Sequence, residues 1–204
     1  MRISWLGHAC FMVEHEGYRL VIDPYCDVPG FADVSVEAEM ALCSHDHFDH
    51  HYLDGVTLCP GKECPFAVET VETFHDDRLG ALRGKNVIHI LRAAGVSVVH
   101  LGDLGHLLSD DQAAKLRGCD VLMIPVGGTY TVDNHGAKAV CEALNPKWVV
   151  PMHYRGARFG FDNIHTVEPF VSHFAPETVC RYDANTLELT ADTHHQVAVL
   201  AAPV

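Results

Sequence analysis

The 204-residue chain has few basic residues and no long apolar run. Lys and Arg number 14 against 27 Asp and Glu, which gives a formal net charge of −13. So few basic residues cannot form the positively charged face that holds a phosphate backbone, which excludes a nucleic-acid-binding protein. No uncharged apolar run approaches the roughly 18 residues that a membrane-spanning helix requires, so no membrane span is expected.

The start of the chain and the cysteines also lack the patterns of an exported protein. Met1 to Trp5 has neither the apolar stretch nor the small-residue cleavage site of a signal peptide. The eight cysteines form no compact disulfide framework, and Cys59 and Cys64 are too far apart for the usual Cys-x₂₋₄-Cys zinc motif. We therefore expect a soluble cytoplasmic protein whose cysteines are reduced and buried as small apolar side chains.

Histidine, by contrast, is abundant. The chain has 16 histidines, more than its 14 Lys and Arg combined. Together with the excess of Asp, this favours metal ligation, because a bound cation neutralises part of the acidic charge. Hydrophobic residues make up 48% of the chain, which excludes a disordered protein. The length is sufficient to bury one hydrophobic core.

The order of the apolar runs predicts an α/β fold in one domain that spans residues 1–204. Short runs rich in β-branched residues predict strands, first alone and later in alternation with helices. The predicted strands are 2–6, 10–14, 19–22, 40–43, 66–74, 96–101, 121–124 and 148–150. A capping-box pattern at Ser109–Gln112 predicts a helix that ends near Gly118, and helical spacing predicts two more, over 137–144 and 167–174. This order predicts packed sheets covered by helices.

The segment Ser44–His51 carries the strongest chemical signal, because it reads Ser-His-Asp-His-Phe-Asp-His-His directly after an apolar strand. Several imidazoles and a carboxylate within a few positions suit a first-row divalent ion. If the chain turns near Asp49, His45 and His47 face one ion while Asp49 and His50 face a neighbouring one. A solvated polar loop is the ordinary alternative, but it does not explain such a cluster at the end of a buried strand.

Three further polar residues each follow an apolar strand. His75 ends the strand 66–74, Asp103 lies just beyond 96–101, and His153 follows the strand that begins at Trp148. Aligned strands would gather these side chains at one edge of the sheets, where functional sites commonly lie. Each residue alone would more often be an ordinary polar residue at a strand end, but the joint pattern favours a metal site.

At this point the sequence resembles the metallo-β-lactamase superfamily. The resemblance rests on His45-x-His47-x-Asp49-His50 followed in order by a single His, a Gly-Asp pair and a late His. Several shorter motifs resemble its branch of small metal-dependent hydrolases: Trp5-Leu6-Gly7-His8-Ala9, Ile22-Asp23-Pro24, His75-Asp76-Asp77 with Arg83-Gly84-Lys85-Asn86, and Pro151-Met152-His153-Tyr154. That branch is related to ascorbate-6-phosphate lactonases and to N-acylethanolamine-releasing phospholipase D enzymes. The resemblance runs from Trp5 to about His153.

The resemblance implies an αββα sandwich, in which two mixed sheets are covered by helices and the metals lie at the edge between the sheets. It implies two divalent ions, with Zn²⁺ as the first choice and Mn²⁺, Fe²⁺ or Ni²⁺ as alternatives. It assigns His45, His47 and His75 to one ion and Asp49, His50 and His153 to the other, with Asp103 bridging both. Asp23 would orient the ligand loop and fix imidazole tautomers.

The resemblance also implies a reaction, in which a metal-bridging hydroxide attacks a small ester, lactone or phosphodiester. Asp49 and Asp103 are then the catalytic carboxylates, with Asp49 orienting the hydroxide and accepting its proton. The substrate is a small molecule that can carry an anionic group, and a homo-oligomer is compatible with the sequence. Two alternatives stay open: a noncatalytic metal-binding or sensing domain, and a mononuclear iron oxygenase on the same scaffold.

Other residues are weaker candidates. His8 is expected close to the metals, as a substrate contact or a partner of a ligand, or else as an ordinary turn histidine. The loop from Gly127 to Asp133 can line the pocket through Tyr130 or Asp133, and Tyr154 can donate a hydrogen bond to the substrate. Arg155 and Arg158 are the basic pair nearest a predicted ligand, so an anionic group can dock there. Of the nine histidines outside the ligand pattern, only His106 and His135 are kept as residues of the pocket rim.

Overall fold

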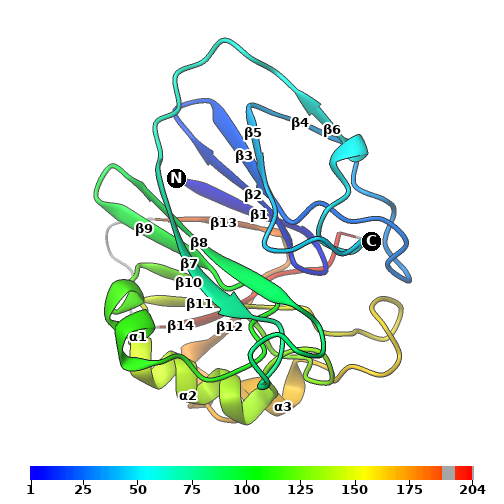
Figure 1. The fold of residues 1–204 in the computed structure, drawn as a ribbon, viewed down its shortest axis with the longest axis vertical. Coiled ribbons are helices and arrows are strands. Elements are labelled where there is room, and N and C mark those ends of the chain that lie inside the picture. The colour runs from blue at the N-terminus through cyan, green and yellow to red at the C-terminus, as the bar shows by residue number, and fades with distance from the viewer. Residues whose placement is uncertain (190–195, 204) are drawn as a thin grey trace.

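Four strands from the start of the chain and one from near its end form a five-stranded sheet. Their side chains alternate between the two faces of the sheet, because successive residues of a β-strand point in opposite directions. The computed structural model describes residues 1–189 and 196–203 (Figure 1). The order in this sheet is β13-β1-β2-β3-β5. Its strands are β1 (Arg2–Gly7), β2 (Cys10–His15), β3 (Tyr18–Ile22), β5 (Met40–Leu42) and β13 (Thr186–Glu188). Strand β5 runs parallel to β3 whereas the other pairs are antiparallel, so the sheet is mixed.

The later apolar runs form a seven-stranded mixed sheet in the order β12-β14-β11-β10-β9-β8-β7. Its strands are β7 (Ala67–Phe74), β8 (Lys85–Ala93), β9 (Val96–His100), β10 (Val121–Pro125), β11 (Trp148–Met152), β12 (Val179–Arg181) and β14 (Gln196–Val199). A separate pair joins β4 (Val36–Ala38) to β6 (Val56–Leu58). Two short 3₁₀ turns, Leu53–Gly55 and Pro176–Thr178, lie outside the sheets.

The α-helices α1 (Asp110–Leu116), α2 (Asn134–Leu144) and α3 (Glu168–Val171) lie along the outer face of the seven-stranded sheet (Figure 1). Helix α1 begins at the predicted capping box: Ser109 accepts from the backbone N–H of Gln112, and the Gln112 side chain accepts from that of Ser109. Helix α3 is shorter than the predicted helix over 167–174. Beyond Val171 the backbone N–H groups of His173 and Phe174 bond three residues back, so the helix tightens and ends.

The five-stranded sheet packs on the seven-stranded one through one face only. Trp5, Phe11 and Leu20 face the main core between the sheets. The alternate side chains, such as those of Met12 and Val21, pack instead against a second cluster that Tyr25, Val28, Val34 and Ala38 supply. The prediction of an α/β fold with two mixed sheets is confirmed. Among the described residues, a loop with a short strand takes the place of helices over the five-stranded sheet.

Two expectations from composition have different outcomes. All eight cysteines are free of disulfide bonds, but only Cys10, Cys119 and Cys141 are buried. The other five are partly exposed, so the prediction of eight buried thiols is wrong for them, because they lie near loops and sheet edges. No helix in the described part of the chain is long and apolar enough to cross a membrane.

The directions of three strands decide where the site lies. Strands β7 and β9 both run antiparallel to β8, and β9, β10 and β11 are parallel to one another. The carboxyl ends of β7, β9 and β11 therefore meet at one edge of the seven-stranded sheet. Residues that follow these ends, with the segment after β5 from the other sheet, gather at this edge.

We expect the capping box to stabilise α1 measurably. Ser109→Ala removes the acceptor for the Gln112 N–H and should lower the free energy of unfolding by about 1 kcal/mol. Equilibrium urea denaturation measures this change. Lys115→Ala, on the exposed side of the same helix, should change the free energy by less than about 0.5 kcal/mol. Equal effects of the two substitutions would contradict the capping role.

Candidate metal centre

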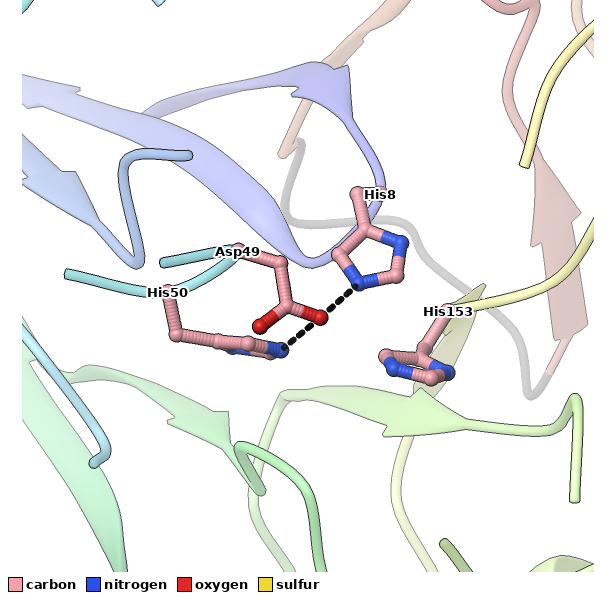
Figure 2. A group of neighbouring side chains, drawn as sticks. All are labelled: His8, Asp49, His50 and His153. Atoms are coloured by element: carbon pink, nitrogen blue, oxygen red, sulfur yellow. Dashed lines mark ion pairs between the residues drawn. The ribbon is translucent and has the colours of Figure 1, made fainter. Parts of the chain in front are cut away.

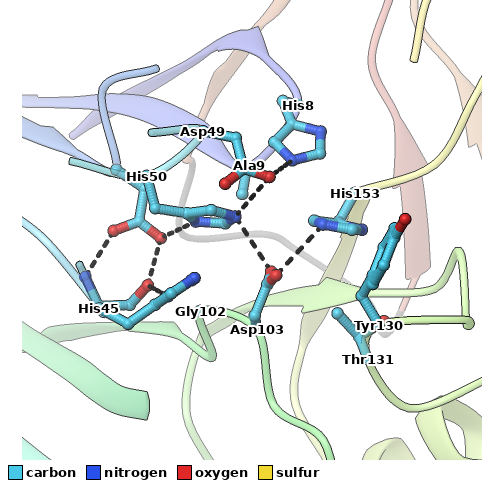
Figure 3. A network of polar contacts seen from close by, with 12 residues as sticks. His8, Ala9, His45, Asp49, His50, Gly102, Asp103, Tyr130, Thr131 and His153 are labelled. Atoms are coloured by element: carbon cyan, nitrogen blue, oxygen red, sulfur yellow. Dashed lines mark hydrogen bonds and ion pairs between the residues drawn. The ribbon is translucent and has the colours of Figure 1, made fainter. Parts of the chain in front are cut away.

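The predicted ligands converge at this edge from four chain segments. His75 directly follows β7, Asp103 lies three residues beyond β9, and His153 directly follows β11. The segment 43–51 after β5 places its side chains opposite them, so the site lies between the two sheets (Figure 3). The convergence follows from strand direction, since each polar residue lies just past a buried apolar run.

One group of possible ligands consists of His45, His47 and His75, whose donor atoms lie within 4.8 Å of one another. Hydrogen bonds to Nδ1 set the tautomers of two of these rings. His45 donates from Nδ1 to Ser44 Oγ at 2.9 Å, and His75 donates from Nδ1 to the Tyr130 carbonyl at 3.1 Å. Each neutral ring is left with an unprotonated Nε2, which is the form that binds a metal.

A second group consists of His8, Asp49, His50 and His153, whose donor atoms also lie within 4.8 Å of one another (Figure 2). Asp49 Oδ2 is 3.3 Å from His8 Nε2 and 3.8 Å from His50 Nε2. The rings of His8 and His153 are 4.2 Å apart between centroids. The structure therefore brings together the three residues that were assigned to the second ion, and it adds His8 to them.

The Asp103 carboxylate lies between the two groups and is 1% exposed. Its Oδ2 atom is 3.1 Å from His75 Nε2, in the first group, and 3.2 Å from His153 Nε2, in the second. Its Oδ1 atom is 3.3 Å from His50 Nε2. One carboxylate thus faces donors of both groups, as a bridging ligand must.

Asp23 holds the ligand loop from behind. Its Oδ1 accepts the backbone N–H of Ser44 at 2.6 Å, and its Oδ2 accepts the Ser44 hydroxyl at 2.7 Å and Nδ1–H of His50 at 2.8 Å. Through Ser44 it also supports His45, so one buried carboxylate orients a ring in each group. This is the position that the predicted orienting role requires.

Asn86, at the start of β8, holds the Asp103 loop in the same way. Its side-chain amide donates to the Leu101 carbonyl at 2.9 Å and accepts the Asp103 N–H at 2.9 Å. Gly102 between them has a φ of 55°, and a Cβ there would overlap Asn86 Oδ1 and the Ser44 side chain. The close approach of these three segments therefore requires glycine at position 102.

The electrostatics of the site call for a cation. Burial alone would raise the pKa values of Asp23 and Asp103, but neighbouring imidazoles outweigh it and hold both well below their usual range. Burial alone would lower the pKa of His50, yet Asp103 and Asp23 hold it well above its ordinary value. The buried carboxylates thus favour positive charge at this point of the structure. A bound metal ion can supply that charge.

Unpartnered polar atoms supply the test of whether a metal fits. Among the described residues, most of the buried side-chain nitrogens and oxygens without a hydrogen-bond partner belong to this one site. They are His8 Nδ1 and Nε2, His45 Nε2, His50 Nε2, Asp103 Oδ1, and His153 Nδ1 and Nε2. A buried polar atom without a partner costs about 1–3 kcal/mol. Their convergence as imidazole nitrogens and carboxylate oxygens fits first-row divalent ions.

A pocket of about 520 Å³ opens onto the two groups. Its lining includes five of the possible metal ligands together with acidic, basic and aromatic side chains. The lining residues are Asp46, His47, Phe48, Asp49, His75, Arg83, Asp103, Tyr130, His153 and Phe161. Tyr130 lies in the pocket as predicted for the loop 127–133. Asp133 does not, because its carboxylate accepts the Gly136 N–H and caps α2.

Arg83, Phe48 and Phe161 are pocket residues to which the sequence analysis assigned no role. The Arg83 guanidinium lies over the Tyr130 ring, 5.6 Å from its centroid, and donates to the Thr129 carbonyl at 3.2 Å. Arg83 is the one cationic side chain among the described residues that line the pocket. Its basic character inside a motif-like segment was the available signal.

A buried carboxylate fixes the loop that carries Arg83. Asp76 accepts backbone N–H groups of Arg78, Gly80, Leu82 and Arg83 at 2.8–2.9 Å. Burial alone would raise the pKa of Asp76, but these four donors outweigh it and lower the pKa to about 2. The Asp76 side chain thus supplies the hydrogen bonds that order the loop between β7 and β8, which contains no helix or strand.

Several weaker candidates lie away from the pocket. Tyr154 is buried and stacks on Trp5 with ring centroids 5.3 Å apart, so its ring packs in the core and does not line the pocket. Arg155 donates to the Ile164 carbonyl and Arg158 is exposed; neither lines the pocket, so the predicted anion dock at this pair lies outside the candidate site.

The two histidines kept as candidates for the pocket rim also lie elsewhere. His106 accepts the Phe74 N–H at 3.2 Å, and His135 packs edge-on against His173 with ring centroids 4.8 Å apart. Neither residue lines the pocket. His194 and His195, to which no function was assigned, lie outside the described residues.

Comparisons with known proteins find similar chains along most of the sequence. The model of the beta-lactamase superfamily domain matches residues 2–153. A UPF0173 protein of Pyrococcus furiosus is 31% identical over 180 residues, which cover 76% of this chain and 83% of that protein. A UPF0173 metal-dependent hydrolase of Carboxydothermus hydrogenoformans is 27% identical, with 76% of this chain and 84% of that protein covered.

A solved structure is similar along nearly the whole chain. The crystal structure of a Thermotoga maritima protein, assigned to the Zn-dependent hydrolases of the metallo-beta-lactamase superfamily, superposes with a TM-score of 0.76. It is 34% identical in sequence, and the alignment covers 98% of this chain and 97% of that one. The likeness therefore includes both sheets and the segments that carry the site.

We predict that Asp76→Asn destabilises the protein at neutral pH but much less in acid. The pKa of Asp76 is about 2 in the folded chain and about 3.9 in an unfolded one. Its contribution is therefore complete above about pH 4 and is lost as the pH falls through about 2. Thermal denaturation should show a lower Tm for the variant at pH 7, with the difference shrinking as the pH falls from 4 toward 2. A pH-independent difference would contradict this account.

Proposed function

The chain belongs to the beta-lactamase superfamily, and on that premise we propose that it is a binuclear metal-dependent hydrolase of a small ester, lactone or phosphodiester. Metal-dependent hydrolysis is the activity named for its UPF0173 relative of C. hydrogenoformans. The observation that carries the binuclear proposal is the Asp103 carboxylate, whose one oxygen lies 3.1 Å from His75 and 3.2 Å from His153. One carboxylate oxygen therefore lies within reach of both donor groups, as a bridging ligand would.

The first ion would be held by His45, His47 and His75, and the second by Asp49, His50 and His153, with Asp103 shared. Nitrogen-rich donor sets of this kind suit Zn²⁺ best, and they also accept Mn²⁺, Fe²⁺ and Ni²⁺. The tautomers that Ser44, Asp23 and Tyr130 impose support this assignment, since each leaves Nε2 free for the metal.

Bound divalent ions lower the pKa of a coordinated water and stabilise negative charge on a carbonyl or phosphoryl oxygen. Asp49 lines the pocket beside the other proposed ligands, and in this mechanism it orients the oxygen of the attacking water. Burial alone would raise the pKa of Asp49, but His8 and His50 outweigh it and hold the pKa well below its usual range. In the proposed mechanism Asp49 orients the attacking oxygen and accepts its proton.

The pocket walls support a substrate-binding role beside the metals. Phe48 and Phe161 face each other edge-on with ring centroids 6.4 Å apart, and both line the pocket. They supply apolar contact area for the substrate and exclude water from the reacting atoms. A noncatalytic metal-binding domain has no need of a lined pocket of about 520 Å³, which favours the enzyme over that alternative.

Arg83 supports a substrate with an anionic group. In this acidic chain it is the one pocket cation among the described residues, and no carboxylate in them pairs with it. One hydrogen bond to Thr129 and the Tyr130 ring hold the guanidinium, which leaves most of its five donors available. A carboxylate or phosphate on the substrate would meet these donors in bidentate geometry.

We expect close to two equivalents of metal per chain by elemental analysis of the purified protein. Asp103→Asn keeps the shape of the bridge but removes its charge, and should lower turnover by about 100-fold or more. A hydrolysis panel of lactones, carboxylic esters and phosphodiesters, run on the same sample, measures the loss. A folded Asp103→Asn protein with unchanged turnover would contradict the proposed mechanism, and full metal occupancy without hydrolysis would favour the noncatalytic alternative.

We also predict that Arg83 sets the preference for anionic substrates. Arg83→Gln should raise KM about 10-fold or more for an ester that carries a carboxylate or phosphate, because charge-assisted hydrogen bonds are lost. KM for the matched neutral ester should stay unchanged. Arg158→Gln, an exposed arginine outside the pocket, provides the control and should affect neither. Equal effects of Arg83→Gln on the charged and neutral esters would refute the role.

A further inference from the structure

We propose that His8 binds the second metal ion directly through Nε2. The inference rests on the proposed binuclear function and adds to its second ion a ligand that the proposed set did not include. His8 lies in the turn between β1 and β2, and Figure 2 shows its ring beside Asp49, with His50 and His153 around the same point. Together with Asp103, the second ion would then have five protein donors, whereas the first has four.

Burial without a partner is the first observation. His8 is 0% exposed, and among the described residues neither of its ring nitrogens has a hydrogen-bond partner. A neutral imidazole carries one donor and one acceptor, and leaving them unpaired in the protein interior is costly. The unpaired His8 ring lies beside three other possible ligands, Asp49, His50 and His153. A metal ion bound among them would be the missing partner of the His8 nitrogen.

Distance is the second observation. His8 Nε2 is 3.3 Å from Asp49 Oδ2, and all donor atoms of the group lie within 4.8 Å of one another. Two ligands that each lie about 2.1 Å from one ion are separated by roughly 3–4 Å. His8 therefore stands at a separation from Asp49 that suits two ligands of one ion.

Two hydrogen bonds to its carbonyl oxygen hold the His8 backbone in this position. Its carbonyl accepts the Trp5 indole N–H at 2.9 Å and the His153 N–H at 3.1 Å. The second of these bonds ties His8 to a residue that is itself a proposed ligand of the same ion. The turn is kept although His8 has a φ of 50°, a conformation that disfavours most side chains.

The competing role for His8 is a hydrogen bond to Asp49 with no bond to the metal. Loss of such a supporting partner typically weakens metal binding about 10–100-fold, so a moderate loss of affinity does not separate the two roles. A direct ligand differs in two respects. Its removal changes the coordination of the ion, and a free imidazole can occupy the vacated position.

The experiment compares metal-free wild type, His8→Gly and His8→Asn in titrations with Co²⁺, followed by visible absorption. Both replacements tolerate the positive φ at position 8, so a fold defect in one is checked by the other. His135→Ala, at an exposed position of α2, is the matched control and should titrate as wild type. Circular dichroism reports whether each variant is folded.

Wild type should bind two equivalents of Co²⁺. In both variants the first equivalent should bind as before, the second more than about 100-fold more weakly and with altered absorption, and imidazole should restore it in His8→Gly. If the second equivalent binds to the variants within 10-fold of wild type and with unchanged absorption, the inference about His8 is overturned, whereas the proposed binuclear function is not. A wild-type chain that binds fewer than two equivalents overturns the binuclear function itself, and only the wild-type titration reports that.

Discussion

The buried Asp103 carboxylate is the feature on which the rest of the site depends. Three imidazoles, from His50, His75 and His153, approach its two oxygens at 3.1–3.3 Å. A carboxylate so deeply buried needs hydrogen-bond donors or positive charge around it, and Asp103 and Asp23 hold the pKa of His50 above its ordinary value. Bound metal ions would supply this positive charge directly. Metal binding should therefore release protons and should weaken in acid, where the imidazoles are protonated.

The same arrangement links the site to the fold. Donors come from the end of β5 in one sheet and from the ends of β7, β9 and β11 in the other, so the packing of the sheets sets the distances between them. Buried polar groups hold the loops at this edge: Asp23 and Asn86 bond backbone or side chains of the ligand segments, and Asp76 orders the Arg83 loop. The apolar core supplies stability, and these three residues supply position.

Eight of the described strands were predicted from local apolar pattern, whereas β4, β6, β8, β12, β13 and β14 were not. The candidate ligands follow from the same pattern. His75, Asp103 and His153 each follow an apolar run, and parallel strand ends must meet at one edge. Arg83 was missed, because its position depends on the Asp76 loop. Tyr154 and the pair Arg155 and Arg158 were misplaced for the converse reason: they are near a ligand in sequence, but the chain turns away from the pocket after His153. Local pattern does not contain such loop geometry.

The central claim is that two ions share the Asp103 carboxylate, and anomalous X-ray scattering from crystals of the metal-loaded protein tests it most directly. Data collected on both sides of the metal absorption edge should give two peaks per chain. One peak should lie among His45, His47 and His75, and the other among Asp49, His50 and His153, with Asp103 in contact with both. A single peak, or two peaks of which only one contacts Asp103, would contradict the account.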